Sequence, residues 1–63
     1  MNDWKNWDVH VLLSFSNTKL RDVYEDLNAL CEDLEIDRFE LEETLSQIGY
    51  TYAIDQNRFV LGD

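Results

Sequence analysis

Residues 17–49 have the sequence NTKLRDVYEDLNALCEDLEIDRFELEETLSQIG, and this stretch decides the fold. Its apolar residues recur at steps of three and four, which is the period of an amphipathic helix. The first run consists of Leu20, Val23, Tyr24, Leu27, Leu30, Cys31 and Leu34. The second run consists of Leu41, Leu45 and Ile48. The pattern predicts one helix at about residues 18–34 and another at about residues 38–48.

The corner between these two helices carries its own local pattern. Asp37 is followed three residues later by Glu40, which resembles the capping box that starts a helix. Ile36 and Leu41 occupy the two positions of a hydrophobic staple, which would fix the direction of the later helix. Gly49 predicts the end of that helix, because glycine adopts positive φ without a steric penalty.

The residues before this stretch predict an earlier helix. Aromatic and aliphatic side chains from Trp4 to Phe15 recur at helical steps, and Asp8 can cap a helix at about residues 8–16. Polar residues 16–18 then interrupt the apolar run, so we expect Asn17 to be the N-cap of the next helix. The tryptophans have two interpretations, which are packing in or beside the core and a partly exposed aromatic patch for a partner.

Beyond the predicted helices the apolar residues alternate, as they do in a β-strand. The alternating residues are Tyr50, Tyr52 and Ile54, followed by Phe59 and Leu61. Residues 55–57 supply a turn, in which Asn57 tolerates the left-handed conformation. Residues 50–61 therefore predict a β-hairpin, which must lie on the helices because a two-stranded hairpin is marginal alone.

Together these elements predict a mostly α (α+β) fold for residues 1–63 as a single domain. We expect a three-helix, helix-turn-helix-like domain with a C-terminal β-hairpin. The hairpin after the third helix resembles the wing of a winged helix-turn-helix protein. Glu35 departs from that pattern, which often has glycine at this point of the turn. The resemblance implies topology and does not by itself imply DNA binding, because many such domains bind proteins.

A more specific resemblance covers residues 12–59. It rests above all on the run Asn17-Thr18-Lys19-Leu20-Arg21-Asp22, together with Leu12-Leu13-Ser14, Tyr24, Leu27, Leu30-Cys31, Ile36-Asp37, Ile48-Gly49-Tyr50, Tyr52, Asn57 and Phe59. In these residues the chain resembles a family of short bacterial proteins known only as a domain of unknown function. That resemblance implies the fold and brings no activity, cofactor or site residue with it.

The net charge of the chain limits the kinds of partner that it can bind. Fourteen Asp and Glu residues stand against five Lys and Arg residues, which gives a net charge of −9. Such a charge repels phosphate backbones and anionic membranes, and it favours a basic partner. No apolar run is long enough to span a bilayer, and the N-terminal residues lack the pattern of a signal peptide. We therefore expect a cytoplasmic protein, where the single Cys31 would stay reduced.

The acidic residues of the second and third predicted helices are the first candidate site. We expect a non-enzymatic protein–protein interaction module that docks on a basic protein surface, in its sharpest form as a nucleic-acid mimic. The candidate residues are Asp22, Glu25, Asp26, Glu32, Asp33, Glu40, Glu42 and Glu43. A competing interpretation is that these acids only keep the protein soluble. Asn17, Lys19 and Arg21 form a second candidate polar site.

Nucleic-acid binding is the alternative function, because the fold resembles a DNA reader. Lys19, Arg21, Arg38 and Arg58 would have to meet phosphates. The predicted recognition helix also presents Glu40, Glu42 and Glu43, which would face phosphates and base acceptors unfavourably. A homodimer through Trp4, Trp7 or the edge of the hairpin is a further interpretation, given how small the core of a 63-residue domain is.

The sequence indicates neither an enzyme nor a metal or cofactor site. Asp33, Glu35 and Asp37 alternate like the first ligands of an EF-hand, but Arg38 stands where that loop needs glycine. His10 is the only histidine and has no acid–base partner beside it in the sequence. Cys31 lies on an apolar helical face, which favours a buried structural thiol over a nucleophile.

Overall fold

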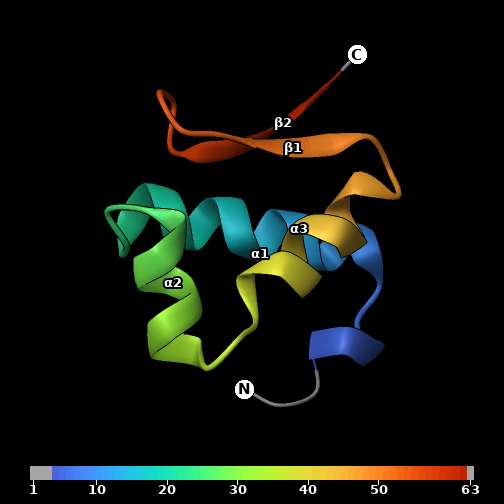
Figure 1. Ribbon diagram of the computed structural model, residues 1–63, viewed down its shortest axis with the longest axis horizontal. Coiled ribbons are helices and arrows are strands. Elements are labelled where there is room, and N and C mark those ends of the chain that lie inside the picture. Colours follow the sequence, from blue (N-terminus) through green and yellow to red (C-terminus); the bar gives the residue numbers. More distant parts are fainter. Residues whose placement is uncertain (1–3, 63) are drawn as a thin grey trace.

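A computed structural model describes residues 4–62 of the chain (Figure 1). Its elements are the short 3-10 helix η1 (Trp4–Asn6), helices α1 (Val9–Asp22), α2 (Leu27–Leu34) and α3 (Arg38–Ser46), and strands β1 (Tyr50–Ala53) and β2 (Arg58–Leu61). The strands form a two-stranded antiparallel sheet. The structure confirms the predicted fold class, which is three helices followed by a C-terminal β-hairpin.

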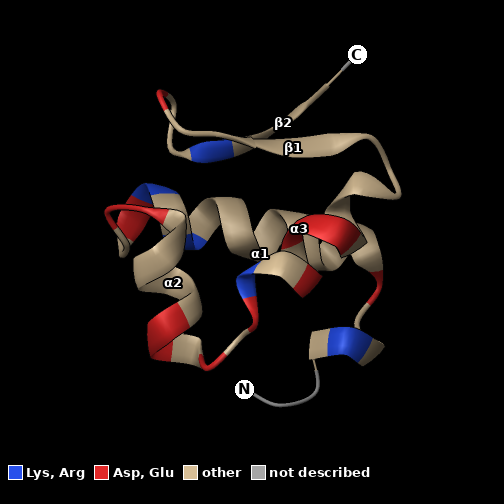
Figure 2. Ribbon diagram, in the orientation of Figure 1, with Lys and Arg blue, Asp and Glu red and all other residues tan. Residues whose placement is uncertain are grey.

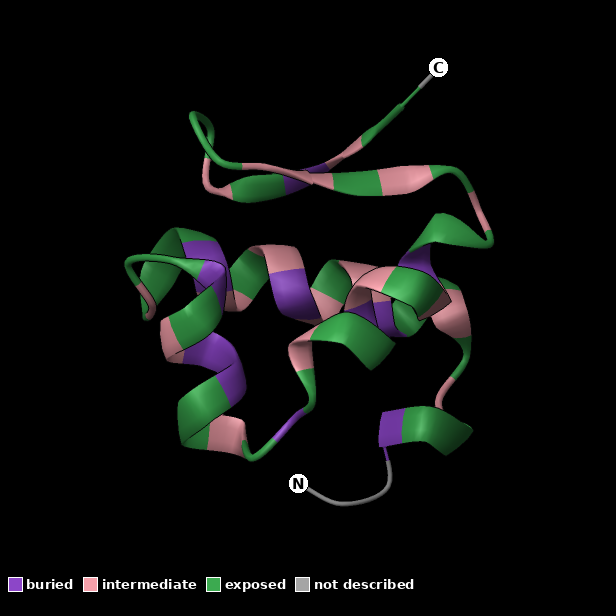
Figure 3. Ribbon diagram, viewed as in Figure 1, coloured by how far each residue is buried: buried purple, intermediate pink, exposed green. Residues whose placement is uncertain are grey.

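The hairpin lies across α1 and α3, while α2 packs at one end of α1 (Figure 1). Strand β2 contacts α1, and strand β1 contacts α3. Buried residues occur in each of the three helices and in β2, so the helices and the hairpin share one core (Figure 3). Its members are Trp4, Leu12, Leu20, Leu27, Leu30, Cys31, Ile36, Leu41, Leu45 and Phe59. Each buried leucine contributes about 1.5–3 kcal/mol through the hydrophobic effect.

The helix that was predicted at residues 18–34 is wrong, because the chain turns a corner inside it. Helix α1 continues through residues 16–18 and ends at Asp22, and α2 begins at Leu27. Ser16 is only 1% exposed and lies one turn from both Leu12 and Leu20, so it belongs to the inner face of α1. The sequence shows one continuous apolar pattern because α1 and α2 both direct apolar residues into the same core.

The corner is marked by backbone hydrogen bonds and by a cap. The backbone N–H groups of Val23 and Tyr24 both donate to the carbonyl of Lys19, at 2.8 and 2.9 Å, which closes α1. Asp26 then accepts a hydrogen bond from the N–H of Ala29 at 2.8 Å and caps α2. Val23, which the period placed inward, is exposed because it lies in this corner.

Asn17 is therefore not an N-cap, and its side chain holds β2 against α1. Its Nδ2 donates to the carbonyl of Phe59 at 3.1 Å, and the N–H of Phe59 donates to its Oδ1 at 2.7 Å. The amide thus makes the pair of hydrogen bonds that a neighbouring strand would make.

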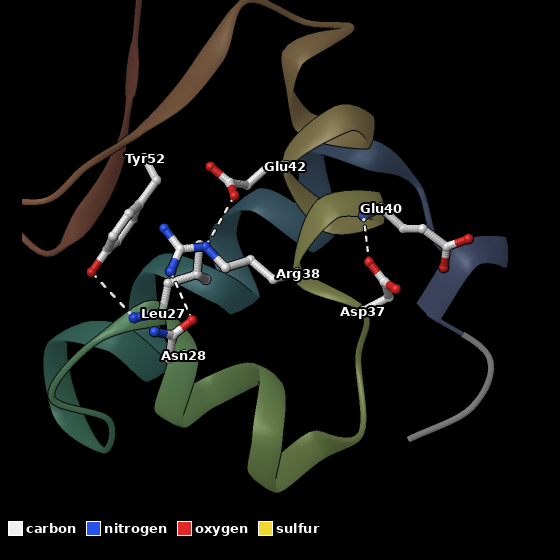
Figure 4. A network of polar contacts seen from close by, with 7 residues as sticks. All are labelled: Leu27, Asn28, Asp37, Arg38, Glu40, Glu42 and Tyr52. Carbon is white, nitrogen blue, oxygen red and sulfur yellow. Dashed lines mark hydrogen bonds and ion pairs between the residues drawn. The ribbon is translucent and has the colours of Figure 1, made fainter.

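Asn57 connects the hairpin to the ends of two helices. It has φ +51°, as predicted for this turn, and its Nδ2 donates to the carbonyls of Leu20 and Tyr24 at 3.0 and 3.1 Å. Its Oδ1 accepts from the hydroxyl of Tyr52 at 2.5 Å. The same hydroxyl accepts from the N–H of Leu27, the first residue of α2, at 3.2 Å (Figure 4). These hydrogen bonds satisfy helix ends that have no partner within their own helices.

Several predicted local features are confirmed. Asp8 caps α1 by accepting from the N–H of His10 at 2.8 Å, and Asp37 caps α3 by accepting from the N–H of Glu40 at 3.1 Å. Gly49 has φ +84° after the last turn of α3. The reciprocal half of the capping box is replaced by an ion pair, because the Glu40 carboxylate lies 2.9 Å from Lys5 Nζ.

The strand pairing and the exposure of the tryptophans test two further predictions. The predicted hairpin is present, with Tyr50 paired with Leu61 and Tyr52 with Phe59. Trp4 is 4% exposed, so it belongs to the core and is unavailable as a dimer contact. Trp7 is half-buried, with its ring edge-to-face on Phe15 at 5.1 Å between centroids. Ile54 and Val11, which the sequence patterns placed inward, are exposed.

We predict that the side chain of Asn57 is a main contributor to stability. Asn57→Gly keeps the positive φ and removes three side-chain hydrogen bonds, so it should lower the free energy of unfolding by about 2–3 kcal/mol. Asn57→Ala should cost about 1 kcal/mol more, because alanine disfavours positive φ. Urea unfolding measures both values. Gln56→Ala, at an exposed position of the same turn, is the control and should change the free energy by less than about 0.5 kcal/mol. A value for Asn57→Gly as small as that of the control would contradict this role.

Candidate functional site

Most of the charged residues lie on the helices and their connecting segments, and few lie on the hairpin (Figure 2). Carboxylates lie along α2, α3 and the segments before and between them, whereas the hairpin carries only Asp55 and Arg58. The eight candidate acids all lie at or between the end of α1 and α3, and all but the half-buried Glu42 are exposed. They do not form one uniform surface, because several of them have partners within the protein.

Two of the candidate acids of the α1–α2 region are bound by neighbours. The Arg21 guanidinium donates to both carboxylate oxygens of Asp22 at 2.8 Å, which lowers the pKa of Asp22 and raises the pKa of Arg21. Arg21 is therefore paired with the residue next to it in the sequence. The hydroxyl of Tyr24 donates to Asp33 at 2.5 Å, and this hydrogen bond raises the pKa of Tyr24.

Glu42 is occupied in a similar way on α3. Arg38 Nε lies 3.0 Å from Glu42 Oε2, and Arg38 Nη1 donates to Asn28 Oδ1 at 2.7 Å (Figure 4). The same guanidinium lies 5.5 Å from the centroid of the Tyr52 ring, a distance that allows a cation–π interaction. Arg38 thus joins α3 to α2 and to the hairpin instead of projecting from a recognition helix.

The remaining candidate acids are Glu25, Glu32 and Glu43, which form no side-chain hydrogen bond or ion pair within residues 4–62. Glu43 stands out among them because of its surroundings. It lies beside a shallow depression of about 390 Å³ between α3 and β1. The residues that line this depression, here called the α3–β1 patch, are Phe39, Glu42, Glu43, Ser46, Tyr50 and Thr51.

Phe39 is the residue of this patch that the sequence argument missed. It is 72% exposed, although it is the largest apolar side chain of α3. Its position could have been recognised, because it lies two residues before Leu41 and so about 200° around the helix from the buried face. Exposed aromatic side chains of this kind are enriched at protein–protein interfaces.

A second concave surface lies between α1 and the hairpin, with a volume of about 740 Å³. Its lining residues are Leu13, Ser14, Asn17, Thr18, Leu20, Arg21, Tyr50, Gln56, Asn57, Arg58 and Phe59. Of the four cations proposed for nucleic acid, only Arg21 and Arg58 meet here. Lys19 lies 5.6 Å from the centroid of the Phe15 ring, and Arg38 is on α3.

The predicted polar site of Asn17, Lys19 and Arg21 is therefore not assembled as one site. The Asn17 amide is occupied by the backbone of Phe59, and Lys19 does not line the groove that contains Arg21.

The described part of the chain holds no cluster of three or more His, Cys, Asp or Glu side chains that could hold a metal ion. His10 is exposed in the first turn of α1, and Cys31 is buried in α2 as predicted. Burial raises the pKa of the Cys31 thiol above its ordinary value. Within residues 4–62, no helix has the length and apolar character needed to cross a membrane.

The fold and its surfaces define a small acidic α+β domain in which a β-hairpin is pinned onto three helices. The chain belongs to the family described as Domain of unknown function (DUF4250), and the match covers residues 6–59. This confirms the family that the sequence resemblance indicated, and it begins at residue 6 where that resemblance began at residue 12. No match was found among the curated proteins or among the solved structures.

We predict that Cys31 is unreactive in the folded protein. The residue is 6% exposed and the pKa of its thiol is raised, so the nucleophilic thiolate is both scarce and shielded. Ellman's reagent at pH 8 should react with the native thiol about 100-fold or more slowly than with the urea-unfolded chain, because reaction requires opening of the core. In a Cys31→Ala background, Ser14→Cys places a thiol at an exposed site of α1 and should react rapidly. Equal native rates for the two thiols would contradict the prediction.

Proposed function

We propose that this protein is a non-enzymatic interaction module that binds a basic protein segment at the α3–β1 patch. The observation that carries the proposal is the 72% exposure of Phe39 beside Glu42 and Glu43. Within the patch, the aromatic ring supplies an apolar anchor, and the unpaired Glu43 supplies a charge that selects Lys or Arg in the partner.

The apolar anchor and the negative charge each favour binding of a basic segment. Burying an exposed phenylalanine side chain stabilises a complex by about 1.5–3 kcal/mol. The net charge of −9 accelerates encounter with a basic surface and repels acidic ones. The other exposed acids, which include Glu25 and Glu32, contribute to this long-range field without direct contact. In the sharpest form of the proposal, they and Glu43 stand for the phosphates of a nucleic acid.

The competing proposal is nucleic-acid binding, for which the specific support is the α1–hairpin groove with Arg21 and Arg58. Arg21 is already paired with Asp22, and Arg38 is engaged by Glu42 and Asn28. Few cations are thus left to offset fourteen acids, which disfavours this reading relative to a basic protein partner.

Partner capture from the source cell tests the proposal with matched baits. Phe39→Ser removes the anchor, and Glu43→Lys reverses the charge beside it. Both positions are exposed, so each variant should fold with a free energy of unfolding within about 0.5 kcal/mol of the original. We expect a set of basic proteins to be retained by the original chain and lost, by about tenfold or more, with either variant.

Asp55→Lys is the matched control, because it makes the same change in net charge at the exposed hairpin turn. It should retain the same partners. Equal loss of the partners with Asp55→Lys and Glu43→Lys would mean that net charge, and not the position of Glu43 in the patch, determines the effect of charge. Retention with all three variants would contradict the patch. A gel shift with random duplex DNA at physiological salt tests the competing proposal, which requires tight binding that Arg58→Glu abolishes.

A further inference from the structure

The two outer edges of the hairpin differ in whether they are available for pairing. The N–H of Gly62 donates to the carbonyl of Gly49 at 2.7 Å, so these residues form a hydrogen-bonded antiparallel pair. Such pairs alternate with pairs whose backbone groups point outward. In the observed register, the outward-pointing residues are Tyr50 and Tyr52 on β1, and Phe59 and Leu61 on β2.

The outer edge of β2 is already occupied at its centre. The Asn17 amide takes both the N–H and the carbonyl of Phe59. On β1, by contrast, the outward backbone groups of Tyr50 and Tyr52 make no hydrogen bond with any part of residues 4–62. The free edge of the sheet is therefore the edge of β1, and open edges of this kind accept an added strand.

This edge borders the α3–β1 patch. Tyr50 and Thr51 line the patch from the strand side, and α3 lines it with Phe39, Glu42, Glu43 and Ser46. The α3 residues follow steps of three and four, so they form one strip along the outer side of that helix. A third strand beside β1 would lie over this strip, in the same way that β1 and β2 lie over α3 and α1.

We infer that the partner contributes an extended basic segment that adds to β1 as a third strand and covers Phe39. This inference rests on the function proposed above and specifies how the segment is bound. Backbone hydrogen bonds to Tyr50 and Tyr52 provide affinity, and side chains on the α3 side provide specificity, as in other cases of strand addition.

The spacing of the strip defines the segment that fits it. Phe39 and Glu43 are four residues apart on a helix, which corresponds to about 6 Å along its axis. Alternate residues of a strand point to one side and are about 6.6 Å apart. A segment with an apolar residue and a Lys or Arg two positions away can therefore place one on Phe39 and the other on Glu43.

Charge decides between a foreign segment and a second copy of this chain. Pairing of two β1 edges would bring two Glu43 side chains and two chains of net charge −9 together. Like charges in such a contact are unfavourable, whereas a basic segment gains from the same carboxylates.

The test uses amide hydrogen exchange of the ¹⁵N-labelled protein with two peptides of one composition. The first, Thr-Val-Thr-Lys-Thr-Val-Thr-Lys, places valine and lysine on the same side of a strand. The second, Thr-Val-Lys-Thr-Thr-Val-Lys-Thr, places them on opposite sides. We expect the first peptide to bind more tightly and to slow exchange at Tyr50 and Tyr52 by about tenfold or more. Thr51 and Ala53, which already pair with β2, are internal controls and should change little.

The outcomes separate this inference from the proposed function. Binding that Phe39→Ser or Glu43→Lys weakens, without slower exchange at Tyr50 and Tyr52, would overturn strand addition and leave the patch as the binding surface. Equal binding of the two peptides would overturn the spacing argument. Protection of these amides that rises with protein concentration in the absence of peptide would identify a second copy as the occupant. The proposed function is tested separately, by partner capture. Equal loss of partners with Phe39→Ser, Glu43→Lys and the control Asp55→Lys would count against it.

Discussion

The hydrogen bonds from the Asn57 amide to the carbonyls of Leu20 and Tyr24 attach the hairpin turn to the end of α1 and to the corner that follows it. A hairpin of two four-residue strands is marginal by itself, and the end of α1 has carbonyls without partners inside the helix. The helices give the hairpin a surface to pack on, and the Asn57 amide of the hairpin turn donates hydrogen bonds to the carbonyls at the end of α1 and in the corner after it. Through the hydroxyl of Tyr52, the same side chain also reaches the first N–H of α2, so the corner between α1 and α2 closes on the hairpin turn.

Asn17 makes the complementary connection on the strand side. Its amide lies on α1 and pairs with the backbone of Phe59, whose side chain is fully buried. Both asparagines belong to the residues that carry the family resemblance, and both act across long sequence separations. Within the run of residues 17–22, Asn17 and the buried Leu20 are thereby explained by folding.

The sequence separation of interacting residues also explains how far the fold and the site could be predicted. The roles of Asp8, Asp37 and Gly49 and the presence of the hairpin were predictable, because their interactions close within a few residues or follow from alternation. The break at residues 16–18 was mispredicted because Asn17 has the local preferences of a cap, while its partner Phe59 is 42 positions away. For the acids, the sequence supplied their number, but their availability depends on tertiary pairs such as Lys5 with Glu40. The exposure of Phe39 was implicit in the helical period and needed no tertiary information.

An open strand edge beside an exposed phenylalanine is ordinarily a risk for self-association. Here the strand is short, and the carboxylate of Glu43 stands at the same edge of a molecule with net charge −9. A second copy that approached this edge would bring the same charges with it, so repulsion opposes pairing between identical chains. A basic segment meets the same field as an attraction. In the proposed binding mode, one set of charges at this edge therefore has two effects, because it opposes self-association and attracts a basic segment.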